Sequence, residues 1–191
     1  MKNTAKITFL LLLASCFMGV CLASGATINL NANFSAGALT ATWPAGINFS
    51  GVLNGQNLAL NDTTSVDQTM VATDATGSGG GWNVTAELQS PLADGPTPMT
   101  LSLDGSALSP SSATAPVQAC GANSTCVLPT NAVSYPVAIS SSSASTIYSA
   151  AGSSGVGIND VSNLEWWLGV PASVPAGNFS DVVTVAISSG P

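Results

Sequence analysis

The stretch Gly79-Gly80-Gly81-Trp82-Asn83-Val84-Thr85-Ala86-Glu87-Leu88 joins a run of glycines to a segment in which apolar and polar residues alternate. A period of two is typical of a β-strand, so Trp82, Val84 and Leu88 are expected on one face and the polar residues on the other. The glycines permit the sharp backbone turn that leads into this strand. We therefore expect Trp82 to be a core residue and not an exposed, ligand-binding aromatic.

Short runs of similar character recur on both sides of this segment. They are separated by Gly, Pro, Asn, Asp and Ser, as expected of antiparallel hairpins, and no segment shows a sustained helical pattern. The predicted fold class is all-β, a single-domain antiparallel β-sandwich. The Ser-, Ala- and Gly-rich stretches 109–116 and 140–157 are expected to be surface loops. The other expected strands are 27–34, 39–43, 52–60, 68–73, 99–103, 133–139, 164–170 and 181–188.

Two adjacent tryptophans lie in the expected strand 164–170. Strand alternation places Trp166 and Leu168 on the core face and Glu165 and Trp167 on the opposite face. Trp167 is therefore the best candidate for an exposed aromatic, with Glu165 beside it to orient a bound sugar ring. The alternative is that Trp167 is buried under a loop or against another subunit.

The N-terminal residues have the pattern of an export signal. Lys2 and Lys6 precede an apolar run, and small residues follow near position 26, so residues 1–26 are expected to be a signal peptide and 27–191 the mature domain. No second long apolar run is present to span a membrane. The expected location is outside the cell, at the cell wall or cell surface. In an alternative reading, Leu13-Ala14-Ser15-Cys16 is a lipoprotein box and Cys16 becomes lipidated.

The charge balance excludes several classes of function. Both cationic residues lie in the leader and there is no histidine, so removing the leader takes the formal net charge from −7 to −9. Nucleic acid is excluded as a partner because polyanion binding requires Lys or Arg. A histidine-dependent catalytic triad is impossible, and we expect no enzyme and no cofactor. A glycosidase that uses the carboxylates of Glu87 and Glu165 is a remaining alternative.

The cysteines and aspartates allow two further expectations. In an exported protein, Cys120 and Cys126 are close enough in sequence to form a small disulfide-closed loop, and their spacing does not suit a metal site. Asp62, Asp67 and Asp74 are expected to cap turns through hydrogen bonds to their own backbone. Calcium stays open as a ligand, because carboxylates and carbonyls are its natural donors.

Several of these segments resemble the WxL surface proteins, a bacterial family named for a Trp-x-Leu motif. Residues 79–85 look like the family's first Trp motif, and residues 49–56 and 71–74 look like the strands and Asp turn before it. Residues 174–181 and 184–187 are similar to its closing hairpin. Where the family has a second Trp motif, this chain has Val185-Ala186-Ile187. The resemblance implies a β-sandwich attached noncovalently to the bacterial cell wall.

Two functions follow as expectations. The first is a secreted, non-enzymatic surface protein that associates noncovalently with the cell wall or envelope, with cell-wall glycan or other surface proteins as partners. The second is a structural subunit of a pilus-like fibre or extracellular matrix. Such a subunit would self-associate by donating the strand 27–34 or by pairing sheet edges.

Overall fold

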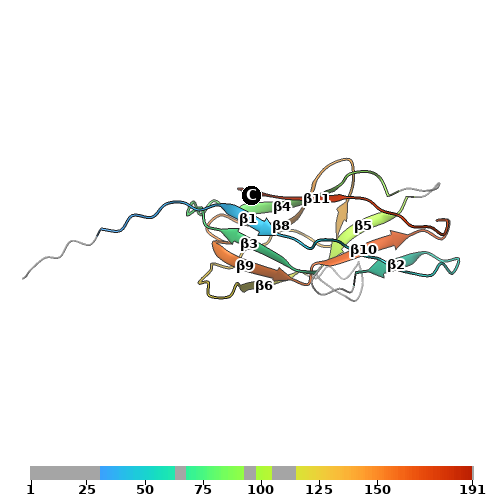
Figure 1. Ribbon diagram of the computed structural model, residues 1–191, viewed down its shortest axis with the longest axis horizontal. Coiled ribbons are helices and arrows are strands. Elements are labelled where there is room, and N and C mark those ends of the chain that lie inside the picture. Colours follow the sequence, from blue (N-terminus) through green and yellow to red (C-terminus); the bar gives the residue numbers. More distant parts are fainter. Residues whose placement is uncertain (1–30, 63–67, 93–97, 105–114, 191) are drawn as a thin grey trace, which may run out of the picture. The chain divides into compact units, whose positions relative to one another are not determined.

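The computed structural model describes residues 31–62, 68–92, 98–104 and 115–190 (Figure 1). The chain divides into two units, Met1–Phe34 and Ser35–Pro191. In the first unit, the described residues 31–34 are exposed and form no strand, so the predicted strand 27–34 is wrong for these four positions. Residues 27–30, the predicted signal peptide and Cys16 lie outside the described residues.

The second unit contains eleven strands among its described residues. They form three antiparallel sheets with the orders β1-β3-β9-β6, β2-β10-β5-β7 and β11-β4-β8, which confirms the predicted all-β, sandwich-like class. No helix in the described part of the chain is long and apolar enough to cross a membrane. The strands are β1 (Leu39–Thr42), β2 (Leu58–Asn61), β3 (Met70–Asp74), β4 (Trp82–Leu88), β5 (Thr100–Asp104), β6 (Val117–Cys120), β7 (Val137–Ile139), β8 (Ser145–Ala150), β9 (Gly157–Ser162), β10 (Glu165–Val170) and β11 (Val183–Ser189).

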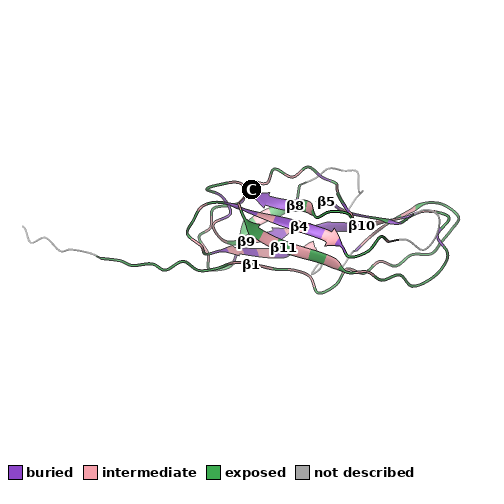
Figure 2. Ribbon diagram, turned by 90° about the horizontal axis from the view of Figure 1, so that it is seen from above, coloured by how far each residue is buried: buried purple, intermediate pink, exposed green. Residues whose placement is uncertain are grey.

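Two of the sheets are joined end to end. β9 runs into β10 across Asn163 and Leu164 alone, and the Leu164 amide donates to the Gln68 carbonyl at 2.9 Å. The main core contains buried residues from all three sheets, which place it between this joined layer and the sheet β11-β4-β8. Figure 2 shows the buried positions along β4 alternating with half-buried ones, as expected of a strand with one face on the core.

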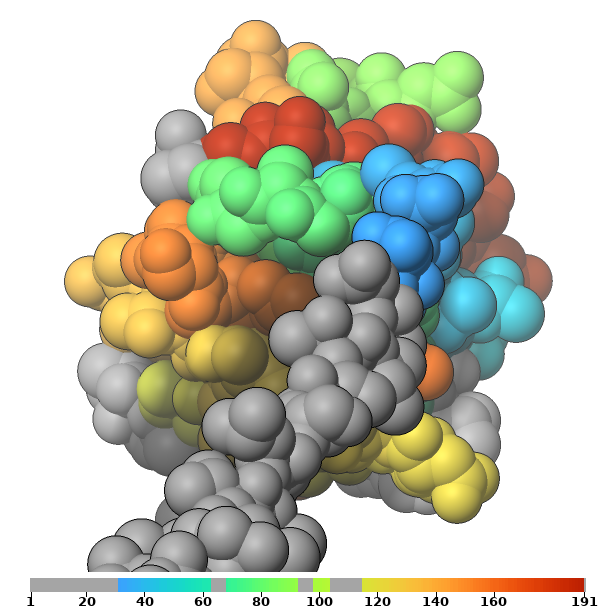
Figure 3. Space-filling view, turned by 90° about the vertical axis from the view of Figure 1, so that its left-hand side faces the viewer, coloured from blue at the N-terminus to red at the C-terminus, as the bar shows by residue number. Residues whose placement is uncertain are grey.

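The glycine-rich turn delivers Trp82 to the core. Trp82 is fully buried, its indole stacks on Tyr148 with ring centroids 5.8 Å apart, and its Nε1–H donates to the Gly155 carbonyl at 3.0 Å. Gly81 has a φ of 76°, and its Cα lies so close to the Ala150 carbonyl oxygen that a Cβ would overlap it. Figure 3 shows this green turn beside the red C-terminal strand and the blue stretch that includes β1. Trp82 is therefore the core residue that strand alternation predicts.

The other predicted core residues are buried or half-buried. Val84 is fully buried, and Leu88 and Trp166 are 6% and 3% exposed. Leu168 is half-buried and packs against a second, smaller cluster formed by Met99, Val170 and Val174.

The prediction of a loop over 140–157 is wrong. β8 lies within this stretch and four consecutive residues, Ile147, Tyr148, Ser149 and Ala150, are buried. The pairing register of β4 and β8 shifts between Val84 and Thr85, as at a β-bulge, and this shift removes the simple alternation from β8. β6 and β9 are also strands that the alternation did not indicate. In the other predicted loop, 115–116 form no strand, and 109–114 lie outside the described residues.

Candidate functional site

The prediction that Trp167 is exposed is wrong. Its side chain is only 6% exposed, and that of Glu165 only 3%. β10 lies inside its sheet, where Trp167 pairs with Asn61 on one side and Ser102 on the other. The face that Trp167 shares with Glu165 meets another part of the chain, because Gln68, just before β3, donates to Glu165. A strand inside a sheet can have both faces covered, and alternation does not reveal this. The buried indole offers no open face on which a sugar ring could stack.

Buried carboxylates in this region serve the fold. Glu165 accepts a hydrogen bond from Gln68 Nε2 at 2.9 Å, and the same nitrogen donates to the Asp62 carbonyl at 2.7 Å. The Asp62 carboxylate accepts from the Asn48 amide at 2.8 Å, which ties the segment after β1 to the end of β2. Within the described ranges, no group of three His, Cys, Asp or Glu side chains could hold a metal ion.

Asp74 caps a turn, as predicted. Its Oδ1 accepts hydrogen bonds from the Thr76 amide at 3.0 Å and from the Thr76 hydroxyl at 2.7 Å. The carboxylate thereby fixes the start of the turn that leads to the glycine run.

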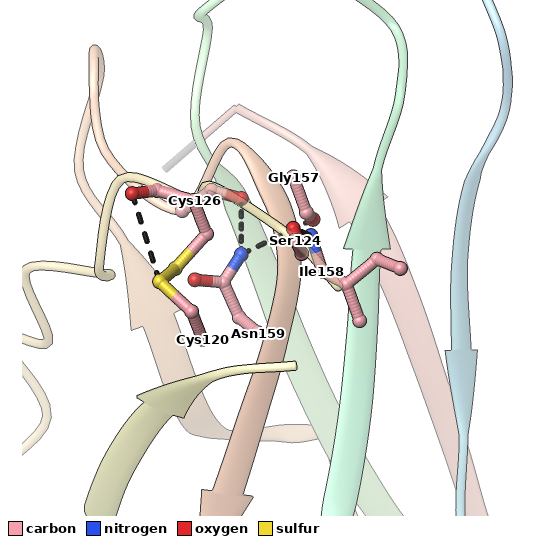
Figure 4. The surroundings of a disulfide bond; sticks show 7 residues. Cys120, Ser124, Cys126, Gly157, Ile158 and Asn159 are labelled. Carbon is pink, nitrogen blue, oxygen red and sulfur yellow. Dashed lines mark hydrogen bonds between the residues drawn. A yellow bond between two sulfur atoms is a disulfide. The ribbon is translucent and has the colours of Figure 1, made fainter. Parts of the chain in front are cut away.

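The predicted disulfide between Cys120 and Cys126 is present and holds a short loop against β9 (Figure 4). The Gly121 amide donates to the Ile158 carbonyl at 2.9 Å, and the Ile158 amide donates to Ser124 Oγ at 3.2 Å. The bond therefore stabilises one edge of the sheet locally.

Among the described residues, a groove lies between the connection that follows β1 and the connection that follows β10. Two adjoining cavities of about 610 and 460 Å³ share part of their lining and form one depression. We call it the apolar groove and define it by the six shared residues Ile47, Asn48, Phe49, Met99, Leu168 and Phe179.

Two connections form the walls of the apolar groove. One wall is the segment 43–53, which continues from β1 and turns back at Asn54 and Gly55 into β2. Asn54 Oδ1 accepts from the Gln56 amide at 3.0 Å, and Gly55 supplies a φ of 80°, so this turn is of the kind that favours Asn-Gly. The other wall is the segment 174–183, between β10 and β11.

Hydrogen bonds involve residues in or next to each wall. The Ala172 amide donates to Asn57 Oδ1 at 2.9 Å, which joins residues that adjoin the two walls. The Asn48 amide of the first wall donates to Asp62 Oδ2 at 2.8 Å. The Val174 amide donates to the Pro171 carbonyl at 3.1 Å and closes the first turn of the second wall.

The floor of the apolar groove consists of core residues. Its deeper part is lined by Leu88, Leu101 and Trp166, which are 6%, 4% and 3% exposed and belong to the main core. Apolar side chains continue to the rim, where Val52 and Val182 are 85% and 55% exposed. A continuous apolar surface from the core to solvent is the kind of patch that marks an interaction site.

Charged residues are scarce around the apolar groove. Asp181 is the one charged residue among its described lining residues. Residues 27–61, which include the whole first wall, contain no charged residue, although the chain has nine acidic residues. The groove is therefore suited to a neutral, apolar partner.

Sequence reasoning missed this site. Most of its lining comes from connections between strands, and the segment 52–60 was expected to be a strand, although β2 begins only at Leu58. The uncharged stretch 27–61 is the one sequence signal that could have indicated it.

Comparisons of the chain with family models, with curated proteins and with solved structures give no match. The resemblance to the WxL family therefore stays a prediction that rests on the quoted motifs.

Proposed function

We propose that this chain is an exported, non-enzymatic surface protein that associates noncovalently with the cell wall or envelope, and that it does so by holding an apolar protein segment in the apolar groove. The observation that carries this proposal is the groove itself. It combines a floor of core residues, two walls formed by connections between strands and an exposed apolar rim. Each of these features favours burial of another chain's side chains.

The chemistry of the chain supports binding over catalysis. With no histidine and with Lys2 and Lys6 in the expected leader, the expected mature domain has no cationic side chain to clamp an anion and no histidine or lysine to act as a base. The carboxylates of Asp62 and Glu165 are buried and bonded to neighbouring residues. Glu165 is one of the two carboxylates of the alternative glycosidase pair Glu87 and Glu165, and its burial leaves that pair without one accessible member.

The lining of the groove favours a protein partner over a glycan. A sugar presents many hydroxyl groups, and each must find a hydrogen-bond partner when it leaves water. The residues shared by the two cavities are apolar except for Asn48. Aliphatic and aromatic side chains of an extended peptide lose much less on entering such a site.

Binding to isolated cell envelopes tests this function. The exported protein, with its N-terminus established by mass spectrometry, would be compared with Phe179→Asp, which places a charge in the groove. Ser173→Asp, an exposed residue of the same connection outside the groove lining, is the matched control. We expect Phe179→Asp to weaken binding at least about tenfold, since it removes an aromatic side chain that the partner would bury and puts a charge in its place. Ser173→Asp should have no effect. Equal binding by wild type and Phe179→Asp would refute the proposal.

A second candidate, the subunit of a fibre or matrix, has its own supporting observation. Phe34 is 94% exposed, and residues 31–34 form no strand. An exposed apolar segment can pair with another copy. Electron microscopy of the concentrated exported protein tests this function: filaments support it, and persistent monomers count against it.

A further inference from the structure

The described residues just before the sandwich are exposed and include one large apolar side chain. Residues 31–34 are exposed, and Phe34, at 94%, has the greatest exposure among the large hydrophobic residues of the described chain. In the sequence of residues 27–34, Ile28, Leu30, Ala32 and Phe34 alternate with Thr and Asn. As an extended strand, this segment would present four apolar side chains to one side and four polar ones to the other.

The apolar groove offers a complementary surface. An extended strand places alternate side chains about 6.6 Å apart, which suits a groove that runs between two walls. Phe49 and Phe179 contribute aromatic side chains from opposite walls, and Phe179 is 38% exposed. A phenylalanine such as Phe34 can pack between them, since aromatic pairs contribute more than their buried area alone.

Electrostatics favour contact between copies at this place. The mature domain is expected to have a net charge of −9, so that two copies repel each other over most of their surfaces. Residues 27–61 are uncharged, and they include both the segment 27–34 and the first wall of the groove. Association through these two elements brings together the neutral parts of each copy.

Within the sandwich, the point where the chain enters is separate from the groove. The Gly37 amide donates to the Ala75 carbonyl at 2.8 Å, which fixes the point where the chain enters the sandwich, just before Leu39. β1 then runs to Thr42 (Figure 1). The lining of the groove begins at the next residue, Trp43. The chain therefore enters the sandwich at one end of β1, and the groove lies past the other end. A contact between two different surfaces repeats head to tail and produces a linear array unless it closes into a ring.

We propose that the apolar groove of one copy binds residues 27–34 of a second copy as an extended strand. This inference rests on the proposed function and names the partner that the groove takes. Phe34 of the second copy lies between Phe49 and Phe179 of the first, and the apolar face of the strand covers the floor residues Met99 and Leu168. The contact is noncovalent, and it links copies in one direction.

Sedimentation of the exported protein over a wide concentration range tests this proposal. Wild type is expected to form a concentration-dependent series of oligomers. Phe34→Asp and Phe179→Asp should each weaken self-association about ten- to hundredfold, the change expected when one phenylalanine is no longer buried. The matched controls, Asn33→Asp on the polar face of the strand and Ser173→Asp outside the groove lining, should associate as wild type does.

Mixing the two defective variants is the sharper experiment. Phe34→Asp retains an intact groove and Phe179→Asp retains an intact strand, so an equimolar mixture should form dimers of one copy of each and no longer species. Phe34 lies outside the sandwich, so its substitution leaves the folded unit unchanged; for Phe179→Asp, an unchanged urea midpoint verifies folding.

Three results would overturn the inference: a monomeric wild type, a Phe34→Asp variant that associates as wild type does, or a mixture in which no dimer forms. These outcomes are distinguishable from a failure of the proposed function. If Phe179→Asp loses envelope binding while wild type stays monomeric, the groove takes a different protein and only the inference fails. If Phe179→Asp retains envelope binding and also self-association, the proposed function and the inference are both wrong.

Discussion

The turn before β4 can be tested by replacing two of its glycines, one at a time, with alanine. Gly79 and Gly81 have φ angles of 62° and 76°. An L-residue in this region costs about 1 kcal/mol. The two positions differ in the space around them. No atom lies within 4 Å of a Cβ built on Gly79, whereas a Cβ on Gly81 would lie 2.9 Å from the Ala151 carbonyl carbon and would overlap the Ala150 carbonyl oxygen.

The expected loss of stability depends on which atoms must move to make room for the added Cβ. The atoms near Gly81 belong to the backbone at the end of β8, where Ala150 pairs with Trp82. They can make room only if the strand shifts, and overpacking of this kind costs about 1–3 kcal/mol. We therefore expect Gly79→Ala to destabilise the protein by about 1 kcal/mol and Gly81→Ala by about 2–4 kcal/mol.

Urea unfolding followed by tryptophan fluorescence measures both changes, because Trp82 becomes exposed when the core opens. Equal shifts of the midpoint for the two variants would refute the reasoning. Such a result would mean that only backbone strain matters and that the close approach to β8 plays no part in placing Trp82.

Three further predictions concern side chains outside the groove. Trp167→Ala should destabilise the protein by about 3–5 kcal/mol in urea unfolding, because this side chain is buried; a change below about 0.5 kcal/mol would mean that it is exposed. Burial, and to a smaller extent the neighbouring Tyr135, raises the pKa of the Tyr148 hydroxyl above its ordinary value of 10.0. The unfolded chain then releases this proton first, so stability should hold below about pH 10 and fall as the pH rises above it. Tyr148→Phe should reduce that fall in urea midpoints measured along a pH series, and an unchanged slope would contradict the assignment. Replacing both Cys120 and Cys126 by serine should cost about 2 kcal/mol, the value expected for so short a loop. Hydrogen exchange should then increase only near the loop and the start of β9, and loss of the whole fold would contradict the local role.

The sequence predicts β4 well because its pattern of apolar and polar residues matches its two faces directly. It has one face on the core and one half-buried face, and its residues alternate from Trp82 to Leu88 without interruption. The strand bounds and the burial of Trp82 therefore follow from the period alone.

The burial of Trp167 could not be predicted from alternation. Alternation divides the residues of a strand into two faces, but it does not say whether the second face meets solvent. That depends on what packs on the second face, and Gln68, which donates to Glu165 on that face, lies 97 residues away in the sequence. The sequence does not predict β8 for a different reason. The register shift between Val84 and Thr85 in its pairing with β4 interrupts the period of two.

The apolar groove could not be predicted from strand patterns, because its walls are connections. The segments 43–53 and 174–183 are far apart in the sequence, and they face each other only because β1, β2, β10 and β11 place them there. Composition alone shows that residues 27–61 are uncharged, and this property became informative only once the groove was located.

Amide hydrogen exchange of the exported wild-type protein, compared between dilute and concentrated solution, tests the central claim most directly. The account predicts that concentration slows exchange in three places: residues 27–34, 43–53 and 174–183. Exchange in the disulfide-bonded loop and in β6 should stay the same. Slower exchange at β6 alone, or no change at any of the three segments, would contradict the claim that the apolar groove holds a strand from another copy.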